Sequence, residues 1–167
     1  SDSSIGTIFY SVEEGMSKSK IKSLINISNK SNTPVLFSKS TYPYKTIGIL
    51  INNDFGETSS NSVAFDLAAS LSASLTAVNV SQPKFLQSEE SSKVSDSIEK
   101  LQDLALSHEI QLDLENKEGN EAKIFSEMSN KFDLSVISTG TNQSWQSRKT
   151  VEFIAINSKS SVLYIPS

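Results

Sequence analysis

The sequence lacks several residue types and motifs on which chemistry often depends. It contains no cysteine, so disulfide bonds, thiolate metal ligands and a cysteine nucleophile are all excluded. It has a single histidine, His108, and no spacing of histidine, aspartate and glutamate that suggests a metal site. Neither a Gly-x-Ser-x-Gly elbow nor a Walker loop is present. From these absences we predict that the chain is not an enzyme.

Long apolar runs and an excess of basic residues are also missing. No apolar stretch approaches the roughly 20 residues that a membrane-spanning helix needs. The 15 Lys and Arg residues are outnumbered by 19 Asp and Glu residues, which gives a net charge of −4 over 167 residues. A protein that binds duplex nucleic acid needs a basic face, so no nucleic-acid partner is expected. The opening Ser-Asp-Ser-Ser does not resemble a signal peptide, and a cytoplasmic location is expected.

The stretch over residues 45–80 organises the rest of the chain. Thr46–Ile51 is a short apolar run followed by Asn52-Asn53-Asp54, which is typical of a strand buried on both faces of a parallel sheet. A helix is predicted next, and residues 76–80 predict a second strand. The helix prediction rests on an apolar stripe at every fourth residue, formed by Val63, Leu67, Leu71 and Leu75. Parallel β-α-β units bind ligands at the carboxyl end of the first strand, here residues 52–56.

Strands and helices continue to alternate to the end of the chain. Apolar periodicity and turn residues predict helices from Ser91, from Gly119-Asn120 and over about 148–157, with strands over 110–114, 132–139 and 161–165. Residues 45–167 thus predict one domain, an α/β fold with a doubly wound, five-stranded parallel sheet and helices on both faces. Residues 1–40 predict a partial β-α-β segment with strands over 5–12 and 33–37. Residues 41–44 predict a linker, because Pro43 disfavours helix.

A weak internal repeat links the two parts of the chain. The segment from Phe9 to Phe37 can be placed on the segment from Val136 to Tyr164 without a gap, at a constant difference of 127 in residue number. The two segments share a strand–loop–helix–strand layout, although two unrelated β-α-β pieces would also share it. If the repeat is real, residues 1–40 are the last third of an earlier copy.

Four segments of residues 45–167 have the order, spacing and residue types of a known family. They are the strand 47–51 with its Ala- and Leu-rich helix, Glu118-Gly119-Asn120-Glu121-Ala122-Lys123-Ile124, Asp133-Leu134-Ser135-Val136-Ile137 and Ser161-Val162-Leu163-Tyr164-Ile165. Together they resemble the universal stress protein family. Thr33-Pro34-Val35-Leu36-Phe37 resembles the same closing strand in an earlier copy. The resemblance implies the adenine nucleotide alpha hydrolase-like fold, and tandem copies occur in the family.

The resemblance also implies where a nucleotide would bind. ATP-binding members carry Gly-x-x-Gly, nine residues and then Gly-Ser/Thr after the fourth strand, where backbone N–H groups and a helix N-terminus meet the phosphates. These positions fall on Ser138, Thr141, Arg148 and Lys149 here, and Asn52 replaces the Asp of the first strand. The implied pocket is therefore degenerate. Its candidate binding residues are Asn52, Asn53, Val78, Ser138, Gly140, Thr141, Arg148 and Lys149.

Each feature of this region also has a purely structural explanation. The hydroxyl-rich loop 138–144 before a helix that begins near Arg148 would suit an anion. Alternatively, Ser144 or Ser147 caps that helix and the basic pair is solvated. Trp145 could stack on a base or lie at an interface. His108, near the end of a predicted helix, is expected to stabilise the helix end rather than to act in catalysis.

We predict a non-catalytic stress-response or regulatory module that acts through dimerisation or partner binding, as a homodimer or as a pseudo-dimer with a second universal-stress-like copy. Apolar residues of the partial segment need cover, and an exposed apolar patch predicts association; they are Ile5, Ile8, Phe9, Ile21 and Ile25. One alternative is the cytosolic regulatory domain of a membrane transporter, an antiporter or permease, which the absent initiating Met suits. A second alternative is an ATP- or AMP-binding universal stress protein; otherwise no cofactor is expected.

Overall fold

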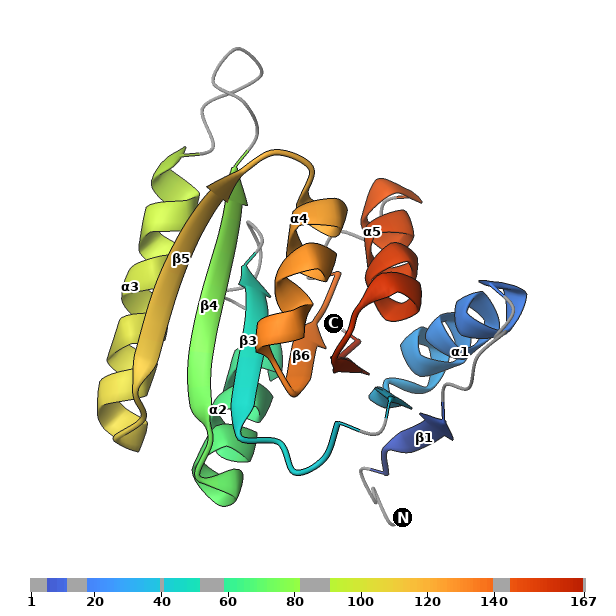
Figure 1. Cartoon of the computed structure of the whole chain (residues 1–167), viewed down its shortest axis with the longest axis horizontal. Helices are drawn as coiled ribbons and strands as arrows, with labels where there is room; N and C mark the ends of the chain where they lie inside the picture. The colour runs from blue at the N-terminus through green and yellow to red at the C-terminus, as the bar shows by residue number, and fades with distance from the viewer. Residues whose placement is uncertain are drawn as a thin grey trace.

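The computed structural model describes residues 6–11, 18–39, 41–51, 59–81, 91–139 and 145–166, without the side chains of 59–61 and 91–97. In these residues seven strands form one sheet in the order β1-β2-β7-β6-β3-β4-β5 (Figure 1). The strands are β1 (Ile8–Ser11), β2 (Val35–Ser38), β3 (Thr46–Ile51), β4 (Ser74–Ser81), β5 (Leu112–Glu118), β6 (Leu134–Ile137) and β7 (Ser161–Tyr164). The helices are α1 (Lys18–Ser31), α2 (Ser59–Leu71), α3 (Ser91–His108), α4 (Glu121–Met128) and α5 (Trp145–Asn157), with a short 3-10 helix, η3 (Ser129–Lys131), after α4.

The predicted doubly wound sheet is confirmed. The five strands β7-β6-β3-β4-β5 run parallel to one another. Helices α2 and α3 cover one face of the sheet, and α1, α4 and α5 cover the other (Figure 1). The two apolar clusters of buried side chains lie on these two faces. The strand order reverses between β3 and β6, and α/β sheets of this kind bind ligands at the carboxyl edge beside that reversal. The topology therefore places the candidate site beyond the ends of β3, β4 and β6.

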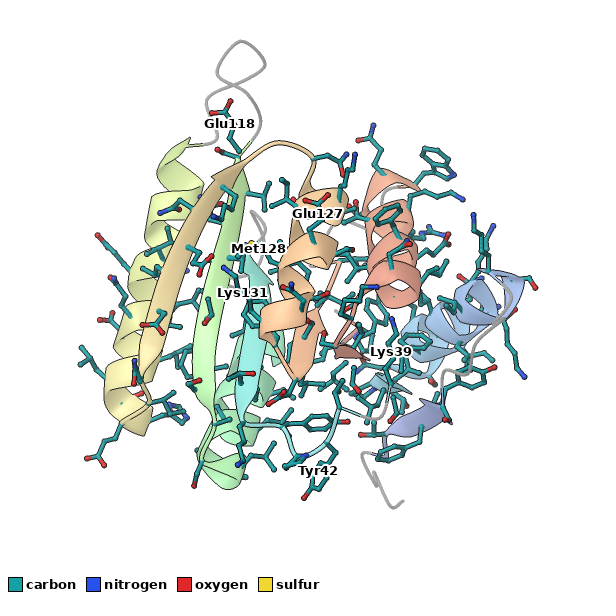
Figure 2. The ribbon with its side chains drawn as sticks, in the orientation of Figure 1. Lys39, Tyr42, Glu118, Glu127, Met128 and Lys131 are labelled. Carbon is teal, nitrogen blue, oxygen red and sulfur yellow. The ribbon has the colours of Figure 1, made fainter. Side chains whose placement is uncertain are left out.

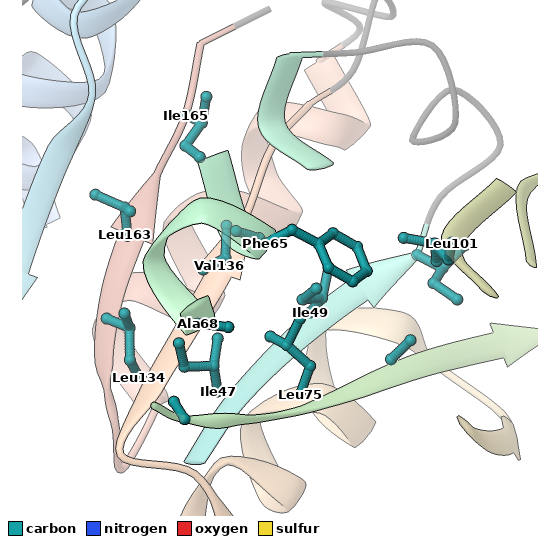
Figure 3. Close-up of a cluster of buried hydrophobic side chains, with 14 of the residues drawn as sticks. Ile47, Ile49, Phe65, Ala68, Leu75, Leu101, Leu134, Val136, Leu163 and Ile165 are labelled. Carbon is teal, nitrogen blue, oxygen red and sulfur yellow. The ribbon is translucent and has the colours of Figure 1, made fainter. Parts of the chain in front are cut away.

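The central strand β3 builds both cores by alternating the direction of its side chains. Ile47, Ile49 and Ile51 join the apolar cluster beneath α2 and α3, whereas Leu50 joins the cluster beneath α4 and α5. Figure 3 shows the first cluster, in which Phe65 of α2 lies beside Ile49. Burial on both faces explains why the strand is a continuous apolar run in the sequence.

Gly48 permits the close approach of the Phe132 side chain to β3. A Cβ atom at this position would overlap the aromatic ring of Phe132, which follows η3. Phe132 is itself buried in the second core and lies 6.1 Å from Phe125, measured between ring centroids. The strand therefore needs glycine here for space rather than for an unusual backbone conformation.

We expect Gly48→Ala to lower the free energy of unfolding by about 1–3 kcal/mol, because the added methyl group forces Phe132 out of its packed position. Urea denaturation followed by circular dichroism measures this change. The double variant Gly48→Ala/Phe132→Leu, which frees space for the methyl group, should lose less than the sum of the two single variants. Full additivity would contradict the proposed overlap.

Helix α2 differs from its prediction in where it ends and which face it buries. It ends at Leu71, which is 36% exposed. Leu75, predicted on the helical stripe, instead belongs to β4 and is fully buried there. The buried face of the helix consists of Ala64, Phe65 and Ala68. The four-residue spacing of the leucines runs across the boundary between helix and strand, so spacing alone placed that boundary wrongly.

The N-terminal β-α-β segment extends the sheet through an antiparallel pair. Strand β2 pairs antiparallel with β7, with Leu36 opposite Leu163. Strands β1 and β2 pair in parallel with partners 27 residues apart, as in Ile8 and Val35, and so do β6 and β7. Helix α1 begins at Lys18 and α5 begins at Trp145. These residue numbers differ by 127, the same difference as in the internal repeat of the sequence. The units β1-α1-β2 and β6-α5-β7 are therefore related by a pseudo-two-fold axis through the Leu36–Leu163 pair.

The antiparallel pairing covers part of the N-terminal segment from within the chain. Ile21 and Ile25 of α1 were expected to need cover, and each is 1% exposed. They belong to the same apolar cluster as Val162 and Tyr164 of β7, and α1 packs on α5. Ile8 is half-buried, whereas Phe9 remains 74% exposed. Ile5 lies outside the described residues.

Hydrogen bonds connect the predicted linker and the residues on either side of it to the amino ends of β6 and β7. The Asp133 carboxylate accepts hydrogen bonds from the backbone N–H groups of Lys45 at 2.8 Å and Thr46 at 3.1 Å. The Thr41 hydroxyl donates to the Asp133 carbonyl oxygen at 2.6 Å. The Lys39 ammonium group donates to the Ser158 carbonyl oxygen just after α5, at 2.6 Å (Figure 2). Burial, with the nearby charge of Lys159, lowers the pKa of Lys39 to about 8.

Candidate functional site

The candidate site lies only partly within the described residues. Asn52, Asn53, Gly140 and Thr141 fall outside them, so their roles stay predictions. Val78, Ser138, Arg148 and Lys149 are described, the first two buried and the last two exposed. The described candidates are therefore of two kinds: two buried residues, Val78 within β4 and Ser138 just after β6, and two exposed cations on α5.

Val78 and Ser138 are the two buried candidate residues near the carboxyl edge of the sheet. Val78 pairs with Leu50 across β3 and β4, is fully buried and belongs to the core beneath α4 and α5. Ser138 follows β6 directly and is 6% exposed. A serine at this position carries a side chain where a glycine would expose its backbone N–H group. Apolar packing accounts for the burial of Val78 without a ligand.

Helix α5 begins three residues earlier than predicted, which changes the setting of the basic pair. Trp145 is the first residue of the helix rather than part of the loop, and it is 71% exposed. Arg148 and Lys149 therefore lie within the first turns instead of at the helix start. Lys149 lies 3.6 Å from the Glu152 carboxylate and 5.5 Å from the centre of the Trp145 ring. These contacts direct its charge along the helix surface.

A buried tyrosine at this edge was not found by sequence reasoning. Tyr164, on β7, is fully buried, and its hydroxyl donates to the Asn29 side-chain oxygen at 2.7 Å. The Thr139 hydroxyl lies 3.4 Å from the same oxygen. Burial raises the pKa of Tyr164, opposed by these hydrogen bonds and by the charge of Arg148. In the sequence Tyr164 appeared only as one residue of the strand predicted over 161–165.

Glu121 introduces an acidic group at the same edge. It is the first residue of α4, directly after the N-cap Asn120, whose side-chain oxygen accepts a hydrogen bond from the Lys123 backbone N–H at 3.0 Å. Burial raises the pKa of Glu121 to about 7. In the sequence Glu121 stood out only as part of the segment 118–124, at the start of a predicted helix. When ionised, this carboxylate opposes the binding of a phosphate at the edge where α4 begins.

His108 makes the contacts expected of a residue that stabilises a helix end. Its Nδ1 atom donates to the Leu104 carbonyl oxygen at 2.9 Å, and its Nε2 atom lies 3.5 Å from the Asp66 carboxylate. The ring also lies 5.7 Å from the ring of Phe65, measured between centroids. In the described part of the chain no three histidine, aspartate or glutamate side chains are grouped so as to hold a metal ion. None of the described helices is long and apolar enough to cross a membrane.

Comparison with known proteins identifies the fold. No family model and no curated protein matches the sequence. Among solved structures, a universal stress protein from Archaeoglobus fulgidus matches with a TM-score of 0.68 at 14% identity, over 96% of this chain and 60% of that one. A universal stress protein in complex with cAMP matches with a TM-score of 0.59 at 17% identity, over 74% of this chain and 97% of that one. The chain has the universal stress protein fold.

Other solved structures with this fold differ in length. An AMP-bound universal stress family protein from Arabidopsis thaliana matches with a TM-score of 0.51 at 12% identity, over 73% of this chain and 91% of its own length. The chain spans about 60% of the Archaeoglobus protein and 63% of a putative universal stress protein from Pseudomonas aeruginosa. The universal stress protein fold thus occurs here in chains both shorter and longer than this one.

We expect the unfolding free energy to fall as the pH rises from about 4.5 to 7, because in this range Glu121 loses its proton in the unfolded state while burial makes the folded state keep it. The variant Glu121→Gln should remove this slope and be more stable than the native chain at pH 8, by up to about 2 kcal/mol after allowance for solvent access. Urea denaturation from pH 4 to 8 measures both curves. Glu127→Gln, an exposed change on the same helix, is the control (Figure 2). An unchanged slope in Glu121→Gln would contradict the assignment.

We expect the Tyr164–Asn29 contact to couple the two β-α-β units. Each of Tyr164→Phe and Asn29→Ala should cost about 1 kcal/mol of unfolding free energy, and the double variant should cost less than their sum. The pseudo-symmetric positions hold an apolar pair, Phe37 and Ile156. Tyr164→Phe/Asn29→Ile, which copies that pair, should therefore be nearly neutral. Additive costs in the cycle would show that the contact carries no coupling.

Proposed function

We propose that this chain is a non-catalytic regulatory module that acts by associating with a second universal-stress-like copy or another partner. The observation that supports this proposal is the β2–β7 pair. Its register is symmetric about Leu36 and Leu163, as in an interface between two like units. A surface that already joins two related units within one chain suits a protein whose activity is association.

The proposed nucleotide pocket is degenerate, and three features support this part of the proposal. Ser138 places a side chain where a phosphate-binding loop has glycine. Lys149 already contacts Glu152 and Trp145. Glu121 adds a carboxylate at the edge where α4 begins. Together these features make anion binding through the family's usual geometry unfavourable.

Adenine-nucleotide binding is the second candidate function. Universal stress proteins with the same fold have been solved in complex with cAMP and with AMP bound. The same edge in this chain carries the start of α5 and two cations, Arg148 and Lys149. A nucleotide would have to bind there through side chains rather than through a glycine-rich loop.

Titration with ATP, AMP and cAMP tests the two candidates. Trp145 is the only tryptophan and begins α5, so its fluorescence reports on this edge without a label. Under the first proposal we expect neither a fluorescence change nor heat in calorimetry up to millimolar nucleotide with Mg²⁺. Saturable binding that the variant Arg148→Glu/Lys149→Glu weakens about tenfold or more would instead support the second candidate.

The interpretation as the cytosolic domain of a transporter remains an alternative and is tested separately. Apolar segments of roughly 20 residues elsewhere in the natural gene product would support it. Their absence from that product would leave a cytoplasmic regulator. Either result is compatible with association as the mode of action.

A further inference from the structure

The pseudo-symmetry of the chain allows each residue of the first β-α-β unit to be compared with an equivalent residue of the second. In the second unit, β6 and α5 are covered by β3, α2 and α4, which all come from residues 45–131. The described part of the first unit has no counterparts of these three elements. The equivalent positions in β1 and α1 therefore show which surfaces they would cover.

The face of β1 shows the first uncovered position. Phe9 is 74% exposed, whereas its equivalent Val136 is fully buried. Val136 belongs to the cluster that contains Phe65 and Ala68 of α2 (Figure 3). A helix in the equivalent of the α2 position would cover Phe9 in the same way.

The outer side of α1 shows the second uncovered position. Ile27 is 50% exposed, whereas its equivalent Ile154 is fully buried in α5, which packs on α4. The helix contains no acidic residue, and two of its exposed lysines, Lys20 and Lys30, lie on the same side of α1 as Ile27. A partner that covers Ile27 is therefore expected to carry an acidic rim.

The free edge of β1 is the third uncovered surface of the first unit. Strand β6 pairs with β7 on one side and with β3 on the other, whereas β1 pairs only with β2 in the described residues. The segment 6–11 reads Gly-Thr-Ile-Phe-Tyr-Ser and has no charged residue to discourage strand addition. The opposite edge strand, β5, carries Asp113, Glu115, Lys117 and Glu118; Figure 2 labels Glu118 at its end. Only the β5 edge has the charges that protect natural sheets from added strands.

We propose that Phe9, Ile27 and the free edge of β1 form one docking surface for a unit of this same fold. The unit supplies a strand parallel to β1 in the position of β3, a helix over Phe9 in the position of α2, and an acidic-rimmed helix over Ile27 in the position of α4. The geometry of β6 gives the register, since Leu134, Ser135 and Val136 pair with Ile47, Gly48 and Ile49. The new strand therefore lies opposite Thr7, Ile8 and Phe9. This surface deepens the proposed function, on which it rests, by naming where and with what the module associates.

A chain that supplies its own covering unit tests this surface. In the second unit, residues 45–131 directly precede residue 132, and residue 132 is equivalent to residue 5. The extended chain therefore consists of residues 45–131 followed by the whole sequence from residue 5 onward. We expect amide hydrogen exchange in the segment 8–11 to slow about tenfold or more relative to the native chain at the N–H groups on the free edge of β1, which do not donate toward β2 as that of Ile8 does. Phe9→Lys in the extended chain should abolish this protection. Leu106→Lys, a change at a leucine that is 78% exposed on α3, is the control and should leave it.

Two results would overturn the inference. One is exchange at residues 8–11 that is as fast in the extended chain as in the native chain, while residues 46–51 of the original copy stay protected. The other is self-association of the native chain that light scattering detects and that Phe9→Lys removes. The β1 surface would then bind the β1 edge of a second identical chain rather than a unit that supplies equivalents of β3, α2 and α4. Self-association that Phe9→Lys does not affect, with unprotected residues 8–11 in the extended chain, would remove this surface but leave the proposal of a dimerising module intact.

Discussion

The antiparallel pairing of β2 with β7 is the contact on which the arrangement of the whole chain depends. A segment of two short strands and one helix is too small to bury a core of its own. By adding β2 to a completed five-stranded sheet, the chain buries Ile21 and Ile25 against β7 and α5 without any other molecule. Hydrogen bonds before and after the linker hold the same junction, because Lys39 donates to the Ser158 carbonyl oxygen and the Lys45 N–H group donates to the Asp133 carboxylate.

The pairing also explains why the two ends of the sheet differ. At one end β5 closes the domain with charged residues on its edge, as a finished sheet does. At the other end β1 repeats the geometry of β6, but within the described residues nothing covers it as β3 and α2 cover β6, so Phe9 and an uncharged strand edge are exposed. A single exposed phenylalanine is ordinary in a folded protein. Phe9, however, is equivalent to the buried Val136, so comparison of the two units indicates which elements would cover it.

The carboxyl edge of the sheet follows a different constraint. The fold places strand ends and two helix starts together there, which in related folds favours an anionic ligand. In this chain the same place holds the Tyr164 hydroxyl bonded to Asn29 of the N-terminal unit, and the carboxyl group of Glu121 under burial. At this edge the Tyr164 hydroxyl therefore connects the two units, and the Glu121 carboxylate adds negative charge when it is ionised.

The sequence alone determined the order of elements, the parallel five-stranded sheet and the offset of 127 between the two β-α-β units, because each depends on local periodicity and spacing. It misplaced the end of α2, since the leucine spacing continues into β4, and the start of α5. Only the tertiary structure decided the direction of the β2–β7 pair, the burial of Ile21 and the raised pKa of Glu121. Each of these depends on contacts between residues far apart in the chain, which a sequence pattern does not record.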